Sequence, residues 1–164
     1  MEQLSANTTP DQSQFKQLRQ QFSALGTLPK ACSQGIKKRY ETACSNIESV
    51  QIKATQQEKL IQARTLLDDT QRNDVIPSYE QVEELCIQLE IMTGIDSPDN
   101  AKKSRMAYQV QRFNEGVTFT SADADDQAQQ ALELARQWNA LGSNDSTEYQ
   151  QLQQRFLQTL DHIK

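Results

Sequence analysis

Between Gly35 and Pro77 the chain contains no glycine and no proline. Its apolar residues recur there in steps of four and three, the spacing that places them on one face of an α-helix. A seam sustained over more than two heptads is typical of a coiled-coil helix. The pattern predicts either one long helix over about residues 30–69 or two helices that meet near residues 49–55. The seam residues are Ile36, Tyr40, Ala43, Ile47, Val50 and Ala54, followed after a change of phase by Leu60, Ala63 and Leu67.

Shorter helices are expected on either side of this stretch, because start and stop signals bracket several apolar helical patterns. A glycine follows each of four patterns, where a helix end favours left-handed backbone; these are Gly26, Gly94, Gly116 and Gly142. Polar capping residues precede the later helices: Ser78, Ser97 followed by Pro98, Ser121 or Asp123, and Asp145 or Ser146. The expected helices cover about residues 11–25, 79–93, 98–115, 123–141 and 146–163.

Each of these helices carries apolar side chains on one face, which we expect to be buried. The helix over 79–93 is apolar on more than one side, so it is the candidate for the most buried segment. The expected inward residues are Phe15, Leu18, Phe22 and Leu25; Val82, Leu85, Cys86 and Leu89, with Ile87 and Ile91 on another side; Met106, Val110 and Phe113; Ala128, Ala131, Ala135 and Trp138; and Tyr149, Leu152, Phe156, Leu160 and Ile163.

Composition supports narrow helical packing. Only 36% of the 164 residues are hydrophobic, and the net charge is −5. Helices with narrow apolar seams suit this composition better than an enzyme with a deep apolar cleft. We therefore predict an all-α fold, an elongated array of helical hairpins with one long helix of coiled-coil character. Four parts are expected: a tail over 1–12, a first hairpin with the long helix over 13–70, a central helical pair over 71–120 and a second hairpin over 121–164.

The two hairpins are similar in sequence. LRQQFSALG at 18–26 matches LARQWNALG at 134–142, and the same offset of 116 residues continues through 47 and 163 with eight identities in thirty positions. Each copy is predicted to be a helix, a glycine turn and a second helix, with one aromatic residue on each helix. The residues that define the repeat are Phe22, Gly26, Arg39 and Tyr40 in the first copy, and Trp138, Gly142, Arg155 and Phe156 in the second.

This pattern resembles a bacterial family of helical repeats called "domain of unknown function 349". The resembling features are an aromatic residue before Ala-Leu-Gly and an Arg-aromatic pair about fourteen residues after the glycine. The block from Ser78 to Gly116 resembles the linker between repeats in proteobacterial members. The resemblance implies a helical array and a C-terminal portion of a longer protein, and it implies no reaction. We expect Arg39 and Arg155 to stack or pair within their own hairpins.

No pattern of catalytic, cofactor-binding or metal-ligating residues is evident, so we predict that the protein is not an enzyme. Cys44 and Cys86 lie on apolar faces and are expected to act as small hydrophobes, whereas Cys32 lies in a turn-like stretch where a reactive thiol is the alternative. His162 is expected in a last helical turn. The acidic residues Glu80, Glu83, Glu84 and Glu90, and also Asp123, Asp125 and Asp126, are interpreted as helix-start and solvent-facing charges.

Two local groups of cations are the candidate phosphate or nucleic-acid contacts: Lys30, Lys37 and Lys38, and Lys102, Lys103, Arg105 and Arg112. The leading hypothesis is nevertheless a non-catalytic interaction or scaffold module in the bacterial cytoplasm, which holds a protein partner or the rest of its own chain. A homodimer is an open alternative, and neither a cofactor nor a membrane partner is expected. The second hypothesis is an RNA- or ribosome-associated protein. An interaction module should depend on exposed apolar residues, and Ile87 and Ile91 are the first candidates.

Overall fold

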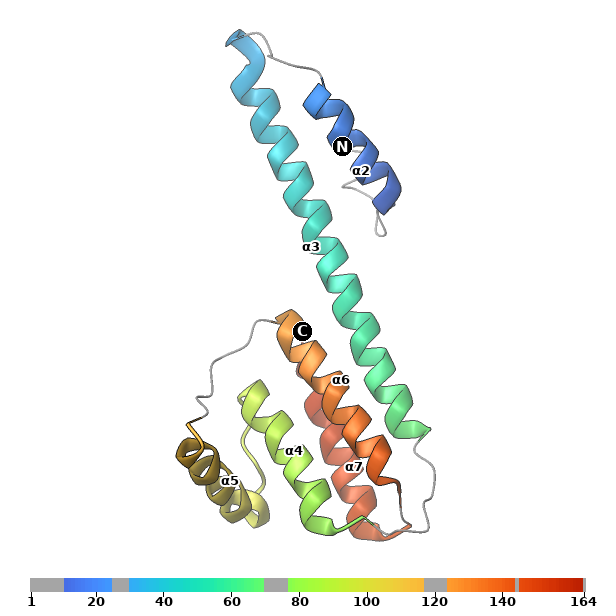
Figure 1. Ribbon diagram of the computed structural model, residues 1–164, viewed down its shortest axis with the longest axis vertical. Helices are drawn as coiled ribbons and strands as arrows, with labels where there is room; N and C mark the ends of the chain where they lie inside the picture. The colour runs from blue at the N-terminus through green and yellow to red at the C-terminus, as the bar shows by residue number, and fades with distance from the viewer. Residues whose placement is uncertain (1–10, 25–29, 70–76, 117–123, 144, 164) are drawn as a thin grey trace. The chain divides into compact units, whose positions relative to one another are not determined.

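The computed structural model describes residues 11–24, 30–69, 77–116, 124–143 and 145–163, without the side chains of residues 30–33 and 124. Within these ranges every regular element is a helix and no strand occurs. The all-α prediction is therefore confirmed. The elements are α2 (Gln12–Ala24), α3 (Lys30–Asp68), α4 (Tyr79–Thr93), a 3-10 turn η1 (Asp99–Ala101), α5 (Lys102–Asn114), α6 (Ala124–Leu141) and α7 (Thr147–Leu160), as Figure 1 shows.

The long helix is continuous, which decides between the two alternatives for residues 30–69. The chain nevertheless forms two compact units, one over Met1–Thr55 and one over Gln56–Lys164. Their boundary falls within α3, in the interval where the apolar seam changes phase between Ala54 and Leu60. The four-part organisation stays a prediction, and this boundary lies inside its 13–70 part.

The first unit has a small core. Phe15 of α2 and Ile47 of α3 are buried against each other, with Leu18 and Cys44 half-buried beside them. The rings of Phe22 and Tyr40 stack with centroids 3.7 Å apart and planes inclined by 7°. The predicted seam is only partly buried, because Ile36 and Ala54 are exposed. Leu25 and Gly26 lie outside the described residues, as does most of the predicted tail, and α2 already begins at Gln12.

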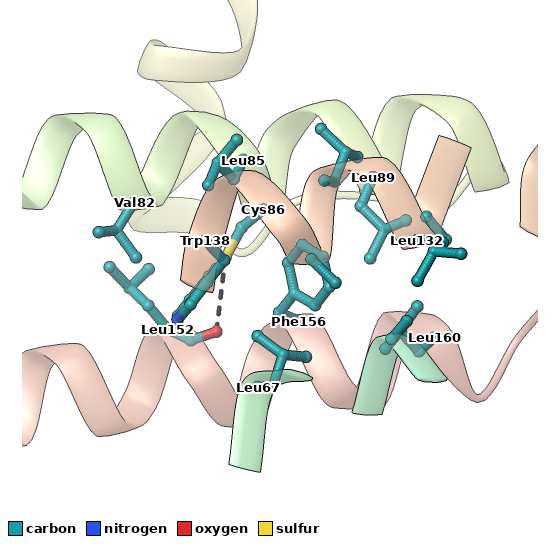
Figure 2. Packing of buried hydrophobic residues seen from close by; sticks show 14 of the residues in the cluster. Leu67, Val82, Leu85, Cys86, Leu89, Leu132, Trp138, Leu152, Phe156 and Leu160 are labelled. Carbon is teal, nitrogen blue, oxygen red and sulfur yellow. Dashed lines mark hydrogen bonds between the residues drawn. The ribbon is translucent and has the colours of Figure 1, made fainter. Parts of the chain in front are cut away.

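The second unit contains the main core, formed where the end of α3 meets α4, α6 and α7. Figure 2 shows Trp138 and Phe156 among leucines from these helices. The two rings meet edge to face with centroids 5.2 Å apart. The inward faces predicted for α6 and α7 are confirmed, because all their members are buried: Ala128, Ala131, Ala135 and Trp138 on α6, and Tyr149, Leu152, Phe156, Leu160 and, after the helix, Ile163.

Helix ends in this unit follow the sequence signals closely. Ser78 caps α4 by accepting from the backbone N–H of Gln81 at 3.3 Å, and Gly94 ends the helix with φ of +74°. Gly142 follows α6 with φ of +86°, and Ser146 caps α7 by accepting from Tyr149 N–H at 3.1 Å. The caps expected at Ser121 or Asp123 lie outside the described residues.

The start expected at Ser97 and Pro98 takes a different form. The chain first makes the short turn η1, and α5 begins at Lys102. The residue at the start of η1 is Pro98, and no side chain caps this turn. The hydroxyl of Ser97 instead donates to the carboxylate of Glu90 on α4 and accepts from the guanidinium of Arg105 on α5.

Candidate functional site

Helix α5 presents its apolar residues to solvent. Met106, Val110 and Phe113 are 68%, 55% and 79% exposed, and α5 has no buried residue at all. The prediction that these three residues form a buried seam is therefore wrong. A row of large apolar side chains at steps of four and three is rare on a solvated surface and is a sign of an interaction site.

Polar contacts hold the opposite side of α5 against the protein, which explains the inversion. Arg105 is half-buried, and its guanidinium donates to the carbonyl of Ile95 and, at 3.2 Å, to the hydroxyl of Ser97. The same serine binds Glu90, so α5 is tied to the core through a chain of hydrogen bonds. Arg105, Ser97 and Glu90 are hydrogen-bonded to one another, so α5 can turn its polar side towards the protein without leaving these groups unpaired. The narrow apolar row is then left on the outside.

We call the outward surface of this helix the α5 outer face and define it by Lys103, Met106, Val110 and Phe113. An open hollow of about 730 Å³ lies along it, and its lining includes three of these four residues, all but Phe113. The surface therefore combines exposed apolar side chains with one cation towards the start of the helix. The carboxylate of Glu115 is engaged within the chain, because it accepts from the amide of Gln111 at 3.1 Å and pairs with Arg112.

The predicted phosphate-contacting cations do not form one exposed patch in α5. Lys102 pairs with Asp99 at 2.6 Å, and Arg112 approaches Glu115 at 3.5 Å while its guanidinium lies 6.0 Å from the centre of the Tyr108 ring. Arg105 points inward, as described above, and Lys103 lines the hollow. In the first unit, Lys37 and Lys38 are exposed, whereas the side chain of Lys30 lies outside the described residues.

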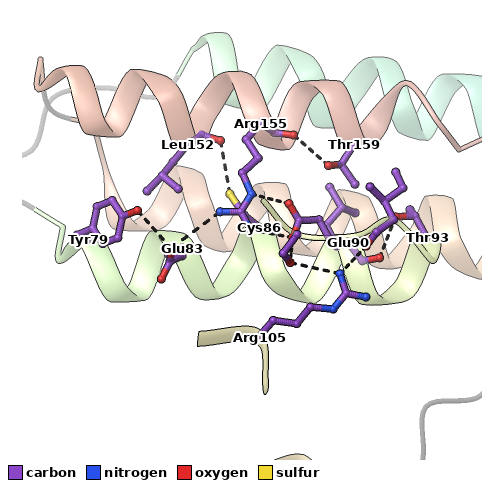
Figure 3. Close-up of polar contacts among 12 residues, drawn as sticks. Tyr79, Glu83, Cys86, Glu90, Thr93, Arg105, Leu152, Arg155 and Thr159 are labelled. Atoms are coloured by element: carbon purple, nitrogen blue, oxygen red, sulfur yellow. Dashed lines mark hydrogen bonds and ion pairs between the residues drawn. The ribbon is translucent and has the colours of Figure 1, made fainter. Parts of the chain in front are cut away.

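A buried ion pair joins α4 to α7 (Figure 3). Nε and Nη2 of Arg155 lie 2.5 and 2.7 Å from the two carboxylate oxygens of Glu90, which is only 2% exposed. Glu83, also buried, lies 3.9 Å from the same guanidinium and accepts from the Tyr79 hydroxyl at 3.2 Å. The interpretation of Glu83 and Glu90 as solvent-facing charges is therefore wrong, while Glu80 and Glu84 are exposed as expected.

Arg155 has a structural role across helices and not within its hairpin. Burial lowers the pKa of Arg155, but the hydrogen bonds and charge of Glu90 outweigh burial and the net shift is upward, so the guanidinium stays charged. Its repeat counterpart Arg39 is exposed. Beside the ion pair lies a cavity of about 380 Å³, and the exposed His162 contributes to its lining.

Cys86 lies in the core, as its apolar position predicted. Its thiol lies 3.4 Å from the carbonyl oxygen of Leu152 and donates to it, and burial raises the thiol pKa to about 12. The thiolate is the reactive form of cysteine, so this side chain is inert in the folded protein. Cys44 is half-buried, and the side chain of Cys32 lies outside the described residues.

Ile87 is buried and does not offer a contact surface, so its choice as an exposed test residue is wrong; Ile91 is half-buried. Sequence periodicity could not have distinguished α4 from α5 in this respect, because both carry apolar rows. The one available signal was the polar side of α5, where Arg105, Tyr108 and Arg112 recur at steps of three and four.

Within the described residues, no cluster of three or more His, Cys, Asp or Glu side chains is arranged to hold a metal ion. None of the described helices combines the length and apolarity that a bilayer span requires. No protein-family model, curated protein or solved structure matches the chain.

Proposed function

We propose that this chain is a non-catalytic helical interaction module of the bacterial cytoplasm, which binds a protein partner through the α5 outer face. The observation that carries the proposal is the exposure of Met106, Val110 and Phe113 on one side of a short helix. Large apolar side chains gathered on a polar surface gain free energy when a partner covers them.

The partner surface that fits this face is another helix. Residues at i, i+4 and i+7 form a straight row along α5, and a facing helix can pack its own apolar row against it. Met106 and Phe113 are suited to such a contact, because thioether and aromatic side chains are enriched at the centres of protein interfaces.

Membership of the repeat family remains part of the proposal. It is supported by the contacts within both hairpins: Phe22 stacks on Tyr40, and Trp138 meets Phe156 edge to face. The 116-residue offset aligns Phe22 with Trp138 and Tyr40 with Phe156, so the two contacts are equivalent in the two copies. If the chain belongs to this family, it is part of a longer helical protein whose activity is binding.

RNA or ribosome binding is the competing function. It would require several free cations on one surface, whereas three of the four α5 cations are engaged by groups of the same chain. The exposed Lys37 and Lys38 are the remaining support for this alternative.

The test is affinity capture from lysate with the whole chain as bait, with and without nuclease, at low and high salt. The informative variant is Met106→Asp/Phe113→Asp, in which both residues are exposed and substitution leaves the core intact. Ile61→Asp is the matched control, because Ile61 is 63% exposed but belongs to α3.

We expect a discrete set of proteins that survives nuclease and salt, is lost with the α5 variant and is retained with the control. Capture of RNA-associated proteins that disappear on nuclease treatment would overturn the proposal in favour of nucleic-acid binding. A protein set that is retained by the α5 variant would show that α5 is not the contact surface.

A further inference from the structure

We infer that the first copy of the repeat, carried by α2 and the start of α3, binds an acidic amphipathic helix of a partner protein, in the place that α4 occupies on the second copy. This surface is separate from the α5 outer face, so the inference goes beyond the proposed function. Three observations carry it: what covers the equivalent residues of the second copy, which contact residues the first copy retains, and the charges of the two sides.

Apolar positions that are buried in the second copy are uncovered in the first. Ile36 is 39% exposed, whereas Leu152, its equivalent at the 116-residue offset, is 4% exposed. The stacked rings of Phe22 and Tyr40 are half-buried, whereas both of their equivalents are fully buried. The first copy therefore presents apolar side chains at positions that neighbouring helices cover in the second.

In the second unit α4 packs along α7, and three polar contacts hold it there (Figure 3). The thiol of Cys86 donates to the carbonyl of Leu152 at 3.4 Å. The carboxylates of Glu90 and Glu83 lie 2.7 and 3.9 Å from the guanidinium of Arg155. On the α7 side, these contacts belong to an apolar residue and to an arginine three positions later.

The first copy retains this pair of residues, since Ile36 and Arg39 have the same spacing and the same place in the repeat. Contacts with the end of α3 are not retained in the same way. In the second copy the side-chain amides of Asn139 and Gln153 donate to backbone carbonyls there, at 2.8 and 3.1 Å. A serine and a lysine stand at the equivalent positions of the first copy, and neither carries an amide. The retained residues therefore select a helix like α4.

Charge favours the same occupant. Residues 11–55 include seven lysines and arginines against three aspartates and glutamates, although the whole chain has a net charge of −5. Lys37, Lys38 and Arg39 are exposed directly after Ile36. Helix α4 has the opposite character, because it contains four glutamates and neither lysine nor arginine. An acidic helix with one apolar face is complementary to the first copy in both respects.

Fluorescence anisotropy tests the inference, with the purified whole chain as receptor and a labelled synthetic peptide of residues 77–96 as the probe. The peptide carries the α4 sequence and stands for the partner helix. We expect saturable binding with a dissociation constant of about 10–300 μM, because the contact is smaller than a standard interface. A peptide of the same composition in scrambled order lacks the apolar row and should bind about ten-fold more weakly.

Ile36→Asp should weaken binding about ten-fold, because a carboxylate replaces the apolar contact and repels the acidic peptide. Ile61→Asp is the matched control, since Ile61 is an exposed isoleucine of the same helix but belongs to the second unit. Arg39→Glu should weaken binding about five-fold, and the peptide variant Glu90→Arg should restore it to within about two-fold. Lys53→Glu, on an exposed part of α3, is the control with the same change in net charge.

Circular dichroism of every variant checks that the helices are retained. A peptide that does not bind at about 500 μM overturns the inference, as does binding that Ile36→Asp leaves unchanged or that the scrambled peptide reproduces. Failure of the exchanged charges to restore binding overturns the placement of the partner's glutamate against Arg39. Neither result decides the proposed function, because lysate capture through the α5 outer face is measured with variants of a different helix.

Discussion

At the residue scale, the buried ion pair of Arg155 and Glu90 determines how two helices pack. Glu90 loses almost all contact with water, and its carboxylate is satisfied by Arg155 and by Ser97. Removing one member of such a pair leaves the other as an uncompensated buried charge, which costs far more than the pair itself contributes. The pair therefore specifies how α4 and α7 fit together.

Arg155→Met should accordingly lower the free energy of unfolding of the second unit by about 3 kcal/mol. The measurement is urea unfolding followed by the fluorescence of Trp138, the one tryptophan of the chain. Arg136→Met is the control. The side chains of Arg136 and Glu133 are 54% and 55% exposed and form an ion pair at 3.4 Å, and loss of this exposed pair should cost less than about 1 kcal/mol. Equal losses in the two variants would contradict this account.

The thiol of Cys86 gives a second prediction at this scale. With its pKa raised to about 12 by burial, Cys86 stays protonated at pH 8.5 and should resist iodoacetamide in the native protein. In urea its pKa returns to an ordinary value and labelling should proceed. The raised pKa also means that the free energy of unfolding falls as the pH rises above about 9, because the unfolded chain then releases this proton first. Mass spectrometry locates the label, and native labelling of Cys86 at the unfolded rate would refute the prediction.

The burial of Glu83 and Glu90 could not be predicted from the sequence. On α4 their spacing is compatible with a solvated acidic face, and only the position of Arg155, 65 residues later, brings a cation to them. A pattern within one helix holds no information about a partner that tertiary packing supplies.

At the element scale, the sequence was most informative about helix ends, because neighbouring residues alone determine where a helix begins and stops. The bounds of α4 and the glycine stops at Gly94, Gly116 and Gly142 depend on residues within one turn, and they were predicted correctly. The structure selects Ser146 from the two caps expected for α7. The inward face of α5 depends on Ser97 and Glu90 in other elements, and it was predicted wrongly. The continuity of α3 was open because a phase change in a seam fits both a straight helix with two partners and two helices.

Two glycines should respond to alanine with opposite signs. Gly94 has φ of +74°, where a Cβ is strained, so Gly94→Ala should cost about 1–2 kcal/mol in urea unfolding followed by Trp138. Gly35 lies within α3 with open space around it, so Gly35→Ala should stabilise that helix by roughly 0.5–1 kcal/mol. Thermal unfolding by circular dichroism measures the second effect. A destabilised Gly35→Ala variant would mean that the helix is interrupted near that residue.

At the scale of the whole molecule, burial is distributed unevenly between the two units. The buried apolar side chains of the first unit are Phe15, Ala43 and Ile47, and all the others that the structure describes belong to the second unit. Two helices that bury so little surface between them are only marginally stable alone, because the free energy gained by forming an isolated helix barely offsets the conformational entropy that the chain loses. The second unit has a core of the kind that supports cooperative unfolding.

Separate fragments should therefore behave differently. A fragment of residues 56–164 should retain a blue-shifted Trp138 emission and a cooperative urea transition, since it contains Ala63, Leu67 and every residue of the main core. A fragment of residues 11–55 should show little helix by circular dichroism at the same concentration. The control is the whole chain, whose Trp138 transition should occur at nearly the same urea concentration as that of the longer fragment. A fragment 56–164 that is unfolded would show that the first half of α3 is needed to hold its second half in place, and the two units would then be one cooperative structure.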